Sequence, residues 1–406
     1  MQGSVGIPLQ ASSRLSCFIK TEVPIGRLQR LAPWQKSLQN SHSSTFQPRG
    51  FADRPWLQNM GPHPAQPASS PRVLSIQSHV VHGYVGNKCA VFPLQLLGFE
   101  VDPIYSVQFS NHTGYPSFKG ARFDGEHLKS LIAGLEENGL MKGYTHLLSG
   151  YMGSVTVLEA IADVMQKMKA ANDGHVTYVC DPVMGDEGKL YVAPELVQAY
   201  RNRIMPLASV LVPNQFEAEL LAGCSSPITS LQGGLAACEA LHAQGPHTVI
   251  ITSMQLPEDT HHVTLLASTT QEQSAGEQFQ RLALRIPKID AYFTGTGDLM
   301  AALLLAWLHH HPHDLKLAIE KATKGLQLVL MDTAAACGAH VLKAPRTSEI
   351  SAARELRLVQ NQAKLAEPEL HVLSLSEGAQ KLECIALGGQ GQPMAKIPST
   401  PSVGTS

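Results

Sequence analysis

The sequence predicts an α/β fold with a largely parallel sheet that is covered by helices on both faces. Two observations support this prediction. Short apolar runs recur along the chain from Arg72 onward, and amphipathic helical stretches separate several of them. A strand that is apolar throughout is buried on both faces, and helices between such strands form the crossovers of a parallel sheet. We expect these crossovers to be right-handed.

The individual elements follow in chain order. The predicted buried strands are Val73–Ile76, His146–Leu148, Val176–Cys180, Val210–Val212 and Val249–Thr252. Amphipathic helices are predicted over Glu126–Leu135, Val155–Met168 and Leu196–Ile204. The later pattern predicts a meander of paired strands, followed by helices; these elements are His262–Ala267, Gln278–Arg285, Leu299–Leu308, Leu315–Met331 and Glu349–Gln360.

The two ends of the chain differ from this regular pattern. Residues 1–70 contain seven basic and two acidic residues, many Ser, Gln and Pro, and no lasting hydrophobic period. Such a segment is either a disordered extension or an organelle-targeting sequence. Residues 71–373 are predicted to form the folded domain. Residues 374–406, rich in Gly, Pro, Gln and Ser toward their end, are expected to be a flexible tail.

Composition excludes several classes of protein. The 31 basic and 33 acidic residues give a formal net charge of −2, so no basic field favours nucleic acid. The longest apolar run, Leu299–Leu308, is far shorter than the roughly 20 residues that span a bilayer. Seven cysteines without a C-x-x-C motif predict free thiols in a reducing compartment. We therefore expect a cytoplasmic location, or an organelle if residues 1–70 are a targeting sequence.

The clearest local motif is Thr-Gly-Thr-Gly-Asp, which ends at Asp298 and precedes an apolar helix. Its two glycines, Gly295 and Gly297, let the backbone turn tightly and present N–H groups to an anion. The start of the helix adds the positive end of its dipole. From these residues alone, Asp298 is either the helix N-cap or a general base.

A second motif, Asp-Pro-Val-Met-Gly-Asp, runs from Asp181 to Asp186 directly after a predicted strand. Ligands of open α/β sheets bind at the carboxyl ends of strands, and two acids near a nucleotide can hold Mg²⁺. The same dipeptides also favour an ordinary turn. Both interpretations remain open at this point.

A third motif, Pro-Asn-Gln-Phe-Glu-Ala-Glu, follows the next strand and opens a helix. Asn214 and Glu217 have the spacing of a capping box, which would be a purely structural role. The same geometry points both side chains toward a phosphate at the helix start, which requires a cation between acid and phosphate. Thr252 and Ser253 supply hydroxyl groups after the following strand.

A fourth pair of segments follows the first two strands. One runs from Ser78 to Asn87 and the other from Gln108 to Tyr115. Both mix aromatic rings, hydroxyl groups and imidazoles, a combination that suits a flat, polar, aromatic ligand. For any single histidine, a hydrogen-bonded structural imidazole is the alternative. The sequence contains neither a P-loop nor the loop set of protein kinases.

Taken in order, these segments resemble pyridoxal kinase, a ribokinase-like enzyme. The matching segments are Ser-Ile-Gln-Ser-His, Gly-Tyr-Val-Gly-Asn, Val-Gln-Phe-Ser-Asn-His-Thr-Gly-Tyr, Tyr-Val-Cys-Asp-Pro-Val-Met-Gly-Asp, Pro-Asn-Gln-Phe-Glu-Ala-Glu and Gly-Thr-Gly-Asp. The resemblance extends from about Arg72 to about Leu373. It implies a three-layer α/β/α sandwich around a mostly parallel sheet, a homodimer, and phosphorylation of the hydroxymethyl group of vitamin B6 by ATP.

The resemblance also implies a role for each matching residue. Asp298 would be the base, and Gly295, Thr296 and Gly297 would complete the anion hole. The residues implied to contact or line the vitamin pocket are Ser78, Thr113, Tyr151, Val85, Val107 and His112. Those implied to line the ATP site are Asp181, Asn214, Glu217, Thr252, Ser253 and Thr296. Asp186 and Glu217 would lie near Mg²⁺ or another divalent ion, and Asp181 and Thr252 near K⁺ or Na⁺.

Two other functions remain possible from the sequence. A hydroxymethylpyrimidine kinase of the same superfamily would use the same base and loop with a different ring pocket. A non-catalytic carrier of the phosphorylated vitamin would not need the base. The segment from Asp186 to Tyr191 is shorter than in some relatives, so the lid near the phosphates is expected to differ.

Overall fold

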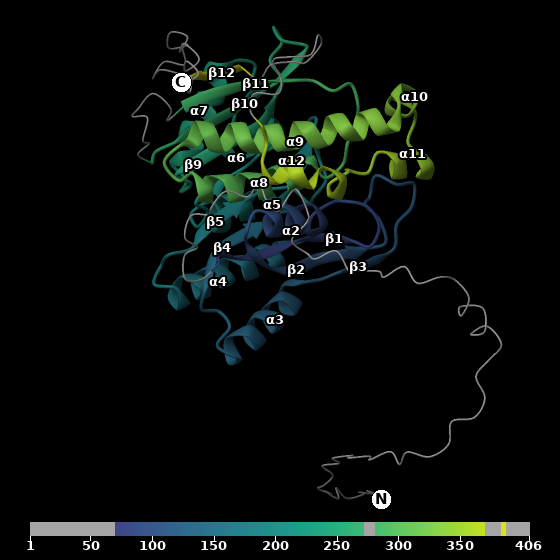
Figure 1. The fold of residues 1–406 in the computed structure, drawn as a ribbon. Helices are drawn as coiled ribbons and strands as arrows, with labels where there is room; N and C mark the ends of the chain where they lie inside the picture. Colours follow the sequence, from purple (N-terminus) through teal and green to yellow (C-terminus); the bar gives the residue numbers. More distant parts are fainter. Residues whose placement is uncertain (1–69, 272–280, 370–382, 387–406) are drawn as a thin grey trace, which may run out of the picture. The chain divides into compact units, whose positions relative to one another are not determined.

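The computed structural model describes residues 70–271, 281–369 and 383–386. Its main sheet has ten strands in the order β12-β11-β10-β9-β8-β5-β4-β1-β2-β3 (Figure 1). In chain order these strands are β1 (Arg72–Val80), β2 (Glu100–Phe109), β3 (Gly120–Arg122), β4 (Tyr144–Ser149), β5 (Thr177–Cys180), β8 (Val210–Leu211), β9 (Thr248–Met254), β10 (His262–Thr269), β11 (Arg281–Pro287) and β12 (Glu383–Ala386).

The centre of this sheet is parallel and its edges are antiparallel. Strands β2, β1, β4, β5, β8 and β9 pair in parallel. Strand β3 closes one edge, and β10, β11 and β12 extend the other, all in antiparallel pairs. The predicted parallel sheet and the predicted meander are both confirmed. Strand β11 begins at Arg281, and residues 278–280 of the predicted strand lie outside the described residues.

Helices cover both faces of the sheet, so the predicted three-layer sandwich is confirmed. Successive strand residues alternate between two apolar clusters; Leu147, for example, belongs to one cluster and Leu148 to the other. The helices of the first cluster are α3 (Gly125–Glu137), α4 (Val155–Ala171), α5 (Glu195–Ala199), α6 (Gln215–Ala222) and α7 (Leu231–His242). Those of the second are α2 (Asn87–Leu96), α8 (Thr296–His310), α9 (Leu315–Cys337) and α12 (Gln362–Ala366).

Helix α8 matters most for the site because its first turn carries Asp298. Every residue from Leu299 to Trp307 is buried, and a helix that is apolar all round must be covered on all sides. Helix α9 packs against α8 and runs across the front of the view in Figure 1. This packing fixes the position of the glycine loop that precedes α8.

One predicted helix is wrong. In place of a helix over Glu349–Gln360, the structure has α11 (Ser348–Ala353), then non-helical chain, then a 3₁₀ turn (Val359–Asn361). Leu356 and Leu358 are both buried in the second apolar cluster. Residues two positions apart share a face in extended chain, so the non-helical segment places both leucines against the core.

The expectation of a flexible tail over residues 374–406 is wrong for four residues. Strand β12 lies inside that segment and pairs with β11. The pairing of this strand depends on backbone groups that β11 presents, which the local sequence does not reveal. The other residues of that segment, and residues 1–69 of the N-terminal extension, lie outside the described part of the chain.

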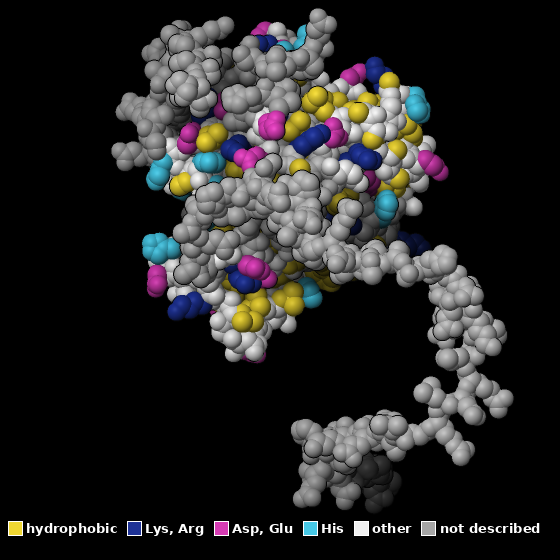
Figure 2. Space-filling model, in the orientation of Figure 1, with side chains coloured by type: hydrophobic (Ala, Val, Ile, Leu, Met, Phe, Trp, Pro, Cys, Tyr) yellow, Lys and Arg dark blue, Asp and Glu magenta, His cyan; other side chains and the backbone are white. Residues whose placement is uncertain are grey.

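Basic and acidic side chains are interspersed on the face of the molecule that Figure 2 shows, around α9. Within the described ranges, no helix is both long and apolar enough to cross a bilayer. The five cysteines whose side chains are described, Cys89, Cys180, Cys224, Cys238 and Cys337, are all free thiols. This agrees with the prediction of unpaired cysteines.

Candidate active site

The predicted site residues converge because the parallel strands end at the same edge of the sheet. Ser78 lies near the end of β1, Tyr151 follows β4, Asp181 follows β5 and Asn214 follows β8. Ligands of α/β sheets bind at this carboxyl edge. Thr252 and Ser253 lie within β9, not after it, and the backbone N–H of Thr252 donates to the Pro213 carbonyl at 2.9 Å.

The glycine loop before α8 has a conformation that only glycine tolerates. Gly295 has φ of +86°, and a Cβ atom there would lie 2.3 Å from the carbonyl oxygen of Tyr84. Gly295 is also the N-cap of α8, so the N-cap alternative for Asp298 is wrong. Thr296 and Gly297 begin the helix, where backbone N–H groups have no intrahelical acceptor. The loop can therefore present N–H groups to an anion.

Asp298 occupies the third position of α8 and faces the segment after β1. Burial raises the pKa of its carboxyl group, and a hydrogen bond from the backbone N–H of Gly86 opposes that rise. Gly86 in turn lies directly on Ser78: a Cβ atom at Gly86 would be 2.4 Å from the Ser78 hydroxyl oxygen. The candidate base and the candidate ring contact Ser78 are thus joined through one glycine.

Asp181 lies next to the glycine loop. Its Oδ2 atom is 3.6 Å from the position that a Cβ atom of Gly297 would occupy. This oxygen is buried and has no hydrogen-bond partner among the described residues. Burial, followed by the negative charges of Glu217 and Asp298, raises the pKa of Asp181 well above its ordinary value. Both of these carboxylates are therefore close enough to Asp181 to raise its pKa.

Glu217 and Asn214 form the predicted capping box at the start of α6. The Glu217 carboxylate accepts hydrogen bonds from the backbone N–H groups of Asn214 and Met184, both at 2.9 Å. The Asn214 amide donates to the Gly185 carbonyl at 2.7 Å. Burial raises the pKa of Glu217 to about 7, although these backbone hydrogen bonds oppose the shift. The structural interpretation is confirmed, and the same two side chains also fix the segment that leads to Asp186.

Asp186 lies in a tight hairpin made by β6 (Gly185–Asp186) and β7 (Lys189–Leu190). The two residues between these strands, Glu187 and Gly188, have φ of 49° and 74°. Positive φ at both positions is typical of a type I′ turn. This turn connects β6 to β7 directly after Asp186. Asp186 is exposed, and its negative charge contributes to the raised pKa of Glu217.

The donor atoms at this edge fit a hard cation that phosphate oxygens help to bind. Among residues 70–271 and 281–369, no three His, Cys, Asp or Glu side chains are grouped to hold a metal ion on their own. A cation bound here would use phosphate oxygens as further ligands, as Mg²⁺ commonly does beside one or two carboxylates. The Oδ2 atom of Asp181 has no partner among the described residues, and a buried acceptor without a partner is costly, so this oxygen is available to a cation.

The residues predicted to line a ring pocket form a separate group. Val85 and Val107, with Val80 and Phe109, make a small apolar cluster apart from the two main ones, and Tyr151 packs against it. His112 is buried, whereas Thr113 next to it is exposed. An apolar patch flanked by hydroxyl and imidazole groups is suited to an aromatic ring with polar substituents.

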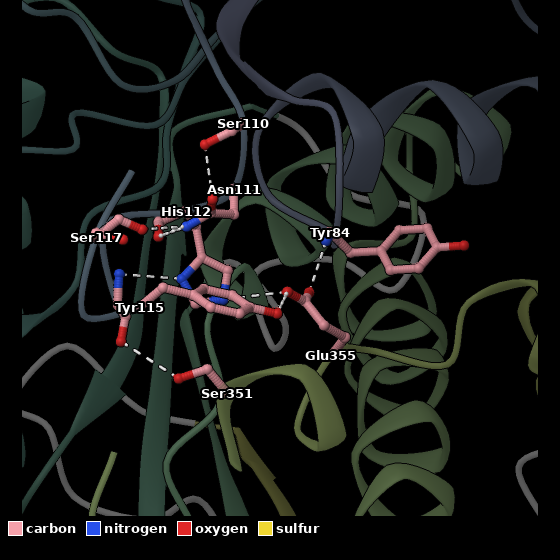
Figure 3. A network of polar contacts seen from close by, with 9 residues as sticks. Tyr84, Ser110, Asn111, His112, Tyr115, Ser117, Ser351 and Glu355 are labelled. Carbon is pink, nitrogen blue, oxygen red and sulfur yellow. Dashed lines mark hydrogen bonds and ion pairs between the residues drawn. The ribbon is translucent and has the colours of Figure 1, made fainter. Parts of the chain in front are cut away.

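One residue at this end of the site was missed in the sequence. Figure 3 shows Glu355 between the loop that carries Tyr84 and the loop that carries His112 and Tyr115. Its carboxylate accepts hydrogen bonds from the Tyr84 backbone N–H at 2.7 Å and the Tyr115 hydroxyl at 2.9 Å. Residue 355 falls inside the predicted helix over Glu349–Gln360, which the structure does not contain. The i, i+2 spacing of Leu356 and Leu358 is the sequence pattern that favours extended chain there.

Comparison with known proteins gives two kinds of match. A family model described as phosphomethylpyrimidine kinase matches residues 147–342. Pyridoxal kinase from Arabidopsis thaliana is 50% identical over 308 residues, covering 76% of this chain and 95% of the relative. Pyridoxal kinase from Homo sapiens is 44% identical over 308 residues, covering 74% of this chain and 97% of the relative.

Solved structures agree with these matches. A structure of pyridoxal kinase from Leishmania donovani in complex with ADP and pyridoxamine is 37% identical, with a TM-score of 0.65, and covers 73% of this chain and 96% of that one. The sheet order and the motifs at its carboxyl edge thus accompany high identity over nearly the whole length of the relatives. The chain belongs to the pyridoxal kinase family, with the ribokinase-like fold.

Proposed function

We propose that this chain transfers the γ-phosphoryl group of ATP to the 5′-hydroxymethyl group of pyridoxal, and also of pyridoxine and pyridoxamine, in the salvage of vitamin B6. The relatives named pyridoxal kinase support the reaction, as do solved structures of the Leishmania donovani enzyme with ADP and pyridoxamine or pyridoxine. The observation that carries the proposal is the position of Asp298. Its carboxylate does not cap the helix. It lies at the glycine loop and accepts a hydrogen bond from Gly86, which packs against Ser78.

The chain's own residues account for the main features of phosphoryl transfer. Asp298 accepts the proton of the hydroxymethyl group, and its raised pKa brings it closer to the operating pH, where a general base is most effective. The N–H groups of Gly295, Thr296 and Gly297 stabilise negative charge on the migrating phosphoryl group. Because the transition state of such reactions is loose, positioning and charge stabilisation supply most of the catalysis.

Two cation sites form part of the proposal. Asp186 and Glu217 would hold Mg²⁺ or another divalent ion, and Asp181 and Thr252 would hold K⁺ or Na⁺. Bound cations would neutralise charge on the phosphate oxygens. The unpartnered Asp181 oxygen supports cation binding at this edge. Glu217 already accepts backbone hydrogen bonds, which favours a role in holding the segment from Met184 to Asp186 in place.

The remaining contacts divide between the two substrates. We assign ATP to the end of the site formed by Asp181, Asn214, Glu217, Thr252, Ser253 and Thr296. We assign the vitamin to Ser78, Val85, Val107, His112, Thr113 and Tyr151. The apolar cluster under Tyr151 supports the second assignment.

We also propose a homodimer and a cytoplasmic location. An organelle is the alternative location if residues 1–70 are a targeting sequence, because these residues are basic and poor in acids. A fluorescent protein fused to residues 1–70 tests the location directly. Accumulation of this fusion in an organelle would overturn the cytoplasmic assignment.

A hydroxymethylpyrimidine kinase is the second candidate, because the matching family model is described as phosphomethylpyrimidine kinase. It would keep Asp298 and the glycine loop but bind a different ring. Rates of ATP consumption with pyridoxal and with hydroxymethylpyrimidine, each alone and in competition, decide between the two. The proposal predicts a kcat/KM for pyridoxal at least tenfold higher, and the opposite preference would replace it with the pyrimidine kinase.

A further inference from the structure

We propose that Glu355 is a positioning residue for the vitamin pocket, joining the loop from Gly83 to Gly86 to the loop from His112 to Tyr115. This inference rests on the proposed function, because it concerns the ring-binding end of the same site. Glu355 lies outside every motif that suggested the function. It reaches the site from the non-helical segment that follows α11.

Three donors from two separate loops converge on the Glu355 carboxylate, as Figure 3 shows. Oε2 accepts from the Tyr84 backbone N–H at 2.7 Å, and Oε1 accepts from the Tyr115 hydroxyl at 2.9 Å. The third donor is His112, whose Nε2 atom is 3.3 Å from Oε1. The His112 Nδ1 atom accepts from the Gly114 N–H at 3.1 Å, which leaves its ring proton on Nε2, toward Glu355.

The surrounding chain is shaped to admit this carboxylate. Gly83 has φ of +89°, and a Cβ atom there would lie 2.1 Å from the Glu355 Oε1 atom. Any side chain at position 83 would therefore displace the carboxylate. The hydrogen bonds that Glu355 accepts lower its pKa, although burial acts in the opposite direction. The carboxylate is thus ionised at neutral pH, and charged acceptors make stronger hydrogen bonds.

Glu355 is itself held firmly from both sides along the chain. The Arg354 guanidinium donates to the carbonyl groups of Leu342 and Ala344, both at 2.8 Å, and this closes the turn between α10 (Ala339–Lys343) and α11. Leu356 is buried in the core. Ser351 also donates to the Gly114 carbonyl at 3.4 Å. A carboxylate anchored in this way can position the two loops, because its own location is fixed by packing.

The positioning extends to the reacting end of the site through Gly86. The loop that Glu355 holds at Tyr84 also contains Val85, in the apolar cluster, and Gly86, which donates to Asp298 and lies on Ser78. The other loop contains His112 and Thr113, both assigned to the vitamin. None of the hydrogen bonds that Glu355 makes involves the ATP end of the site. Loss of Glu355 should therefore affect the two substrates unequally.

The test is the Glu355→Gln variant of the full chain. Glutamine has the same shape, but it has only one acceptor oxygen for three donors, so at least one donor is left unpaired. We expect the KM for pyridoxal to rise about tenfold, the usual scale for a hydrogen bond to a charged group, while the KM for ATP changes less than twofold. A purely structural role would lower the amount of active enzyme and leave both KM values unchanged. That result would overturn the proposal.

Glu349→Gln is the matched control, because it removes the same charge from the exposed first turn of α11. We expect both of its KM values to stay within twofold of the wild type. If Glu355→Gln does not fold, Tyr115→Phe removes one of the three donors and should raise the KM for pyridoxal about threefold. An unchanged KM for pyridoxal in Tyr115→Phe would then count against the proposal.

Hydrogen exchange gives a readout that does not depend on turnover. In Glu355→Gln, the backbone amides of Tyr84, of residues 112–115 and of Ser117 should exchange faster, while those of Asn214 to Glu217 keep the wild-type rate. If the exchange rates in the variant rose equally at both places, or stayed at the wild-type values at both, the positioning role would be overturned. A wild-type chain that makes no pyridoxal phosphate would instead overturn the proposed function, so the two failures are distinguishable.

Discussion

The two ends of this site, which we assign to ATP and to the vitamin, share one sheet edge but are held together differently. At the ATP end, Glu217 bonds to Asn214 three residues away and to Met184 33 residues away. At the vitamin end, Glu355 bonds to Tyr115 and Tyr84, which are 240 and 271 residues away. The ATP end is organised by short motifs that cap their own helices. The vitamin end is complete only when the chain after α9 has packed onto the sheet.

Gly295→Ala is expected to lower kcat more than any other substitution considered. The glycine loop lies between the two ends of the site, so its displacement affects both. A Cβ atom there would meet the Tyr84 carbonyl at 2.3 Å, and a φ of +86° is strained for alanine. Displacing the loop removes anion-hole donors and shifts Asp298 together. We expect kcat to fall by roughly 10³, the upper range for the loss of one such donor. Steady-state kinetics at saturating ATP and pyridoxal measure it, and a fall of less than tenfold would show that the loop tolerates a side chain.

Asp181→Asn is expected to have a smaller effect, which is confined to the kinetics with ATP. This change removes the buried carboxylate whose Oδ2 atom has no partner, so cation and ATP binding should weaken. We expect kcat/KM for ATP to fall by roughly 10–100-fold, with the KM for pyridoxal within twofold of the wild type. Titration of activity with Mg²⁺ and K⁺ measures the change. If the dependence on both ions stayed the same, Asp181 would have no role in cation binding.

At the ATP end, the raised pKa of Glu217 predicts that the free energy of unfolding depends on pH. Burial raises the pKa of Glu217 to about 7 from an ordinary value near 4.5. The folded protein without ligands therefore binds this proton more tightly than the unfolded chain does. The resulting stabilisation is fully present below about pH 4.5 and is lost as the pH rises through about 7.

The expected loss between pH 5 and pH 8 is on the order of 2–3 kcal/mol in the free energy of unfolding. Urea denaturation at several pH values measures it, with Glu217→Gln as the comparison because glutamine does not titrate. The free-energy difference between wild type and variant should shift in the variant's favour as the pH rises. A constant difference would contradict the raised pKa of Glu217.

The features that the sequence predicts are mostly local, whereas most of those it does not predict depend on contacts between distant segments. The buried strands, the capping box of Asn214 and Glu217 and the glycine loop before Asp298 are local patterns, and the structure contains all of them. The role of Glu355 depends on contacts between distant segments. Its neighbours Leu356 and Leu358 are buried by tertiary packing, which overrides the helical propensity of that stretch.

Strand β12 is also absent from the sequence-based prediction, and it too depends on a contact between distant segments. The short strand β12 pairs only because β11 presents a free edge. The hairpin after Asp186 is not predicted from the sequence either. Gly188 favours such a turn, but Glu187 has φ of 49°, which is uncommon for a residue other than Gly, Asn or Asp. Residue roles that rest on the family resemblance alone, such as the contact of Thr113 with the vitamin, stay predictions.

The most direct test of the account is the rate of ATP-dependent pyridoxal phosphate formation by the wild type and by Asp298→Asn, at saturating Mg²⁺, ATP and pyridoxal. Asp290→Asn is the matched control, because Asp290 is an exposed acid ahead of the same loop and pairs with Lys343. We predict rapid product formation by the wild type and the control. In Asp298→Asn, kcat should fall by roughly 10² or more while ATP binding is retained. A near wild-type kcat in Asp298→Asn would contradict the assignment of Asp298 as the base.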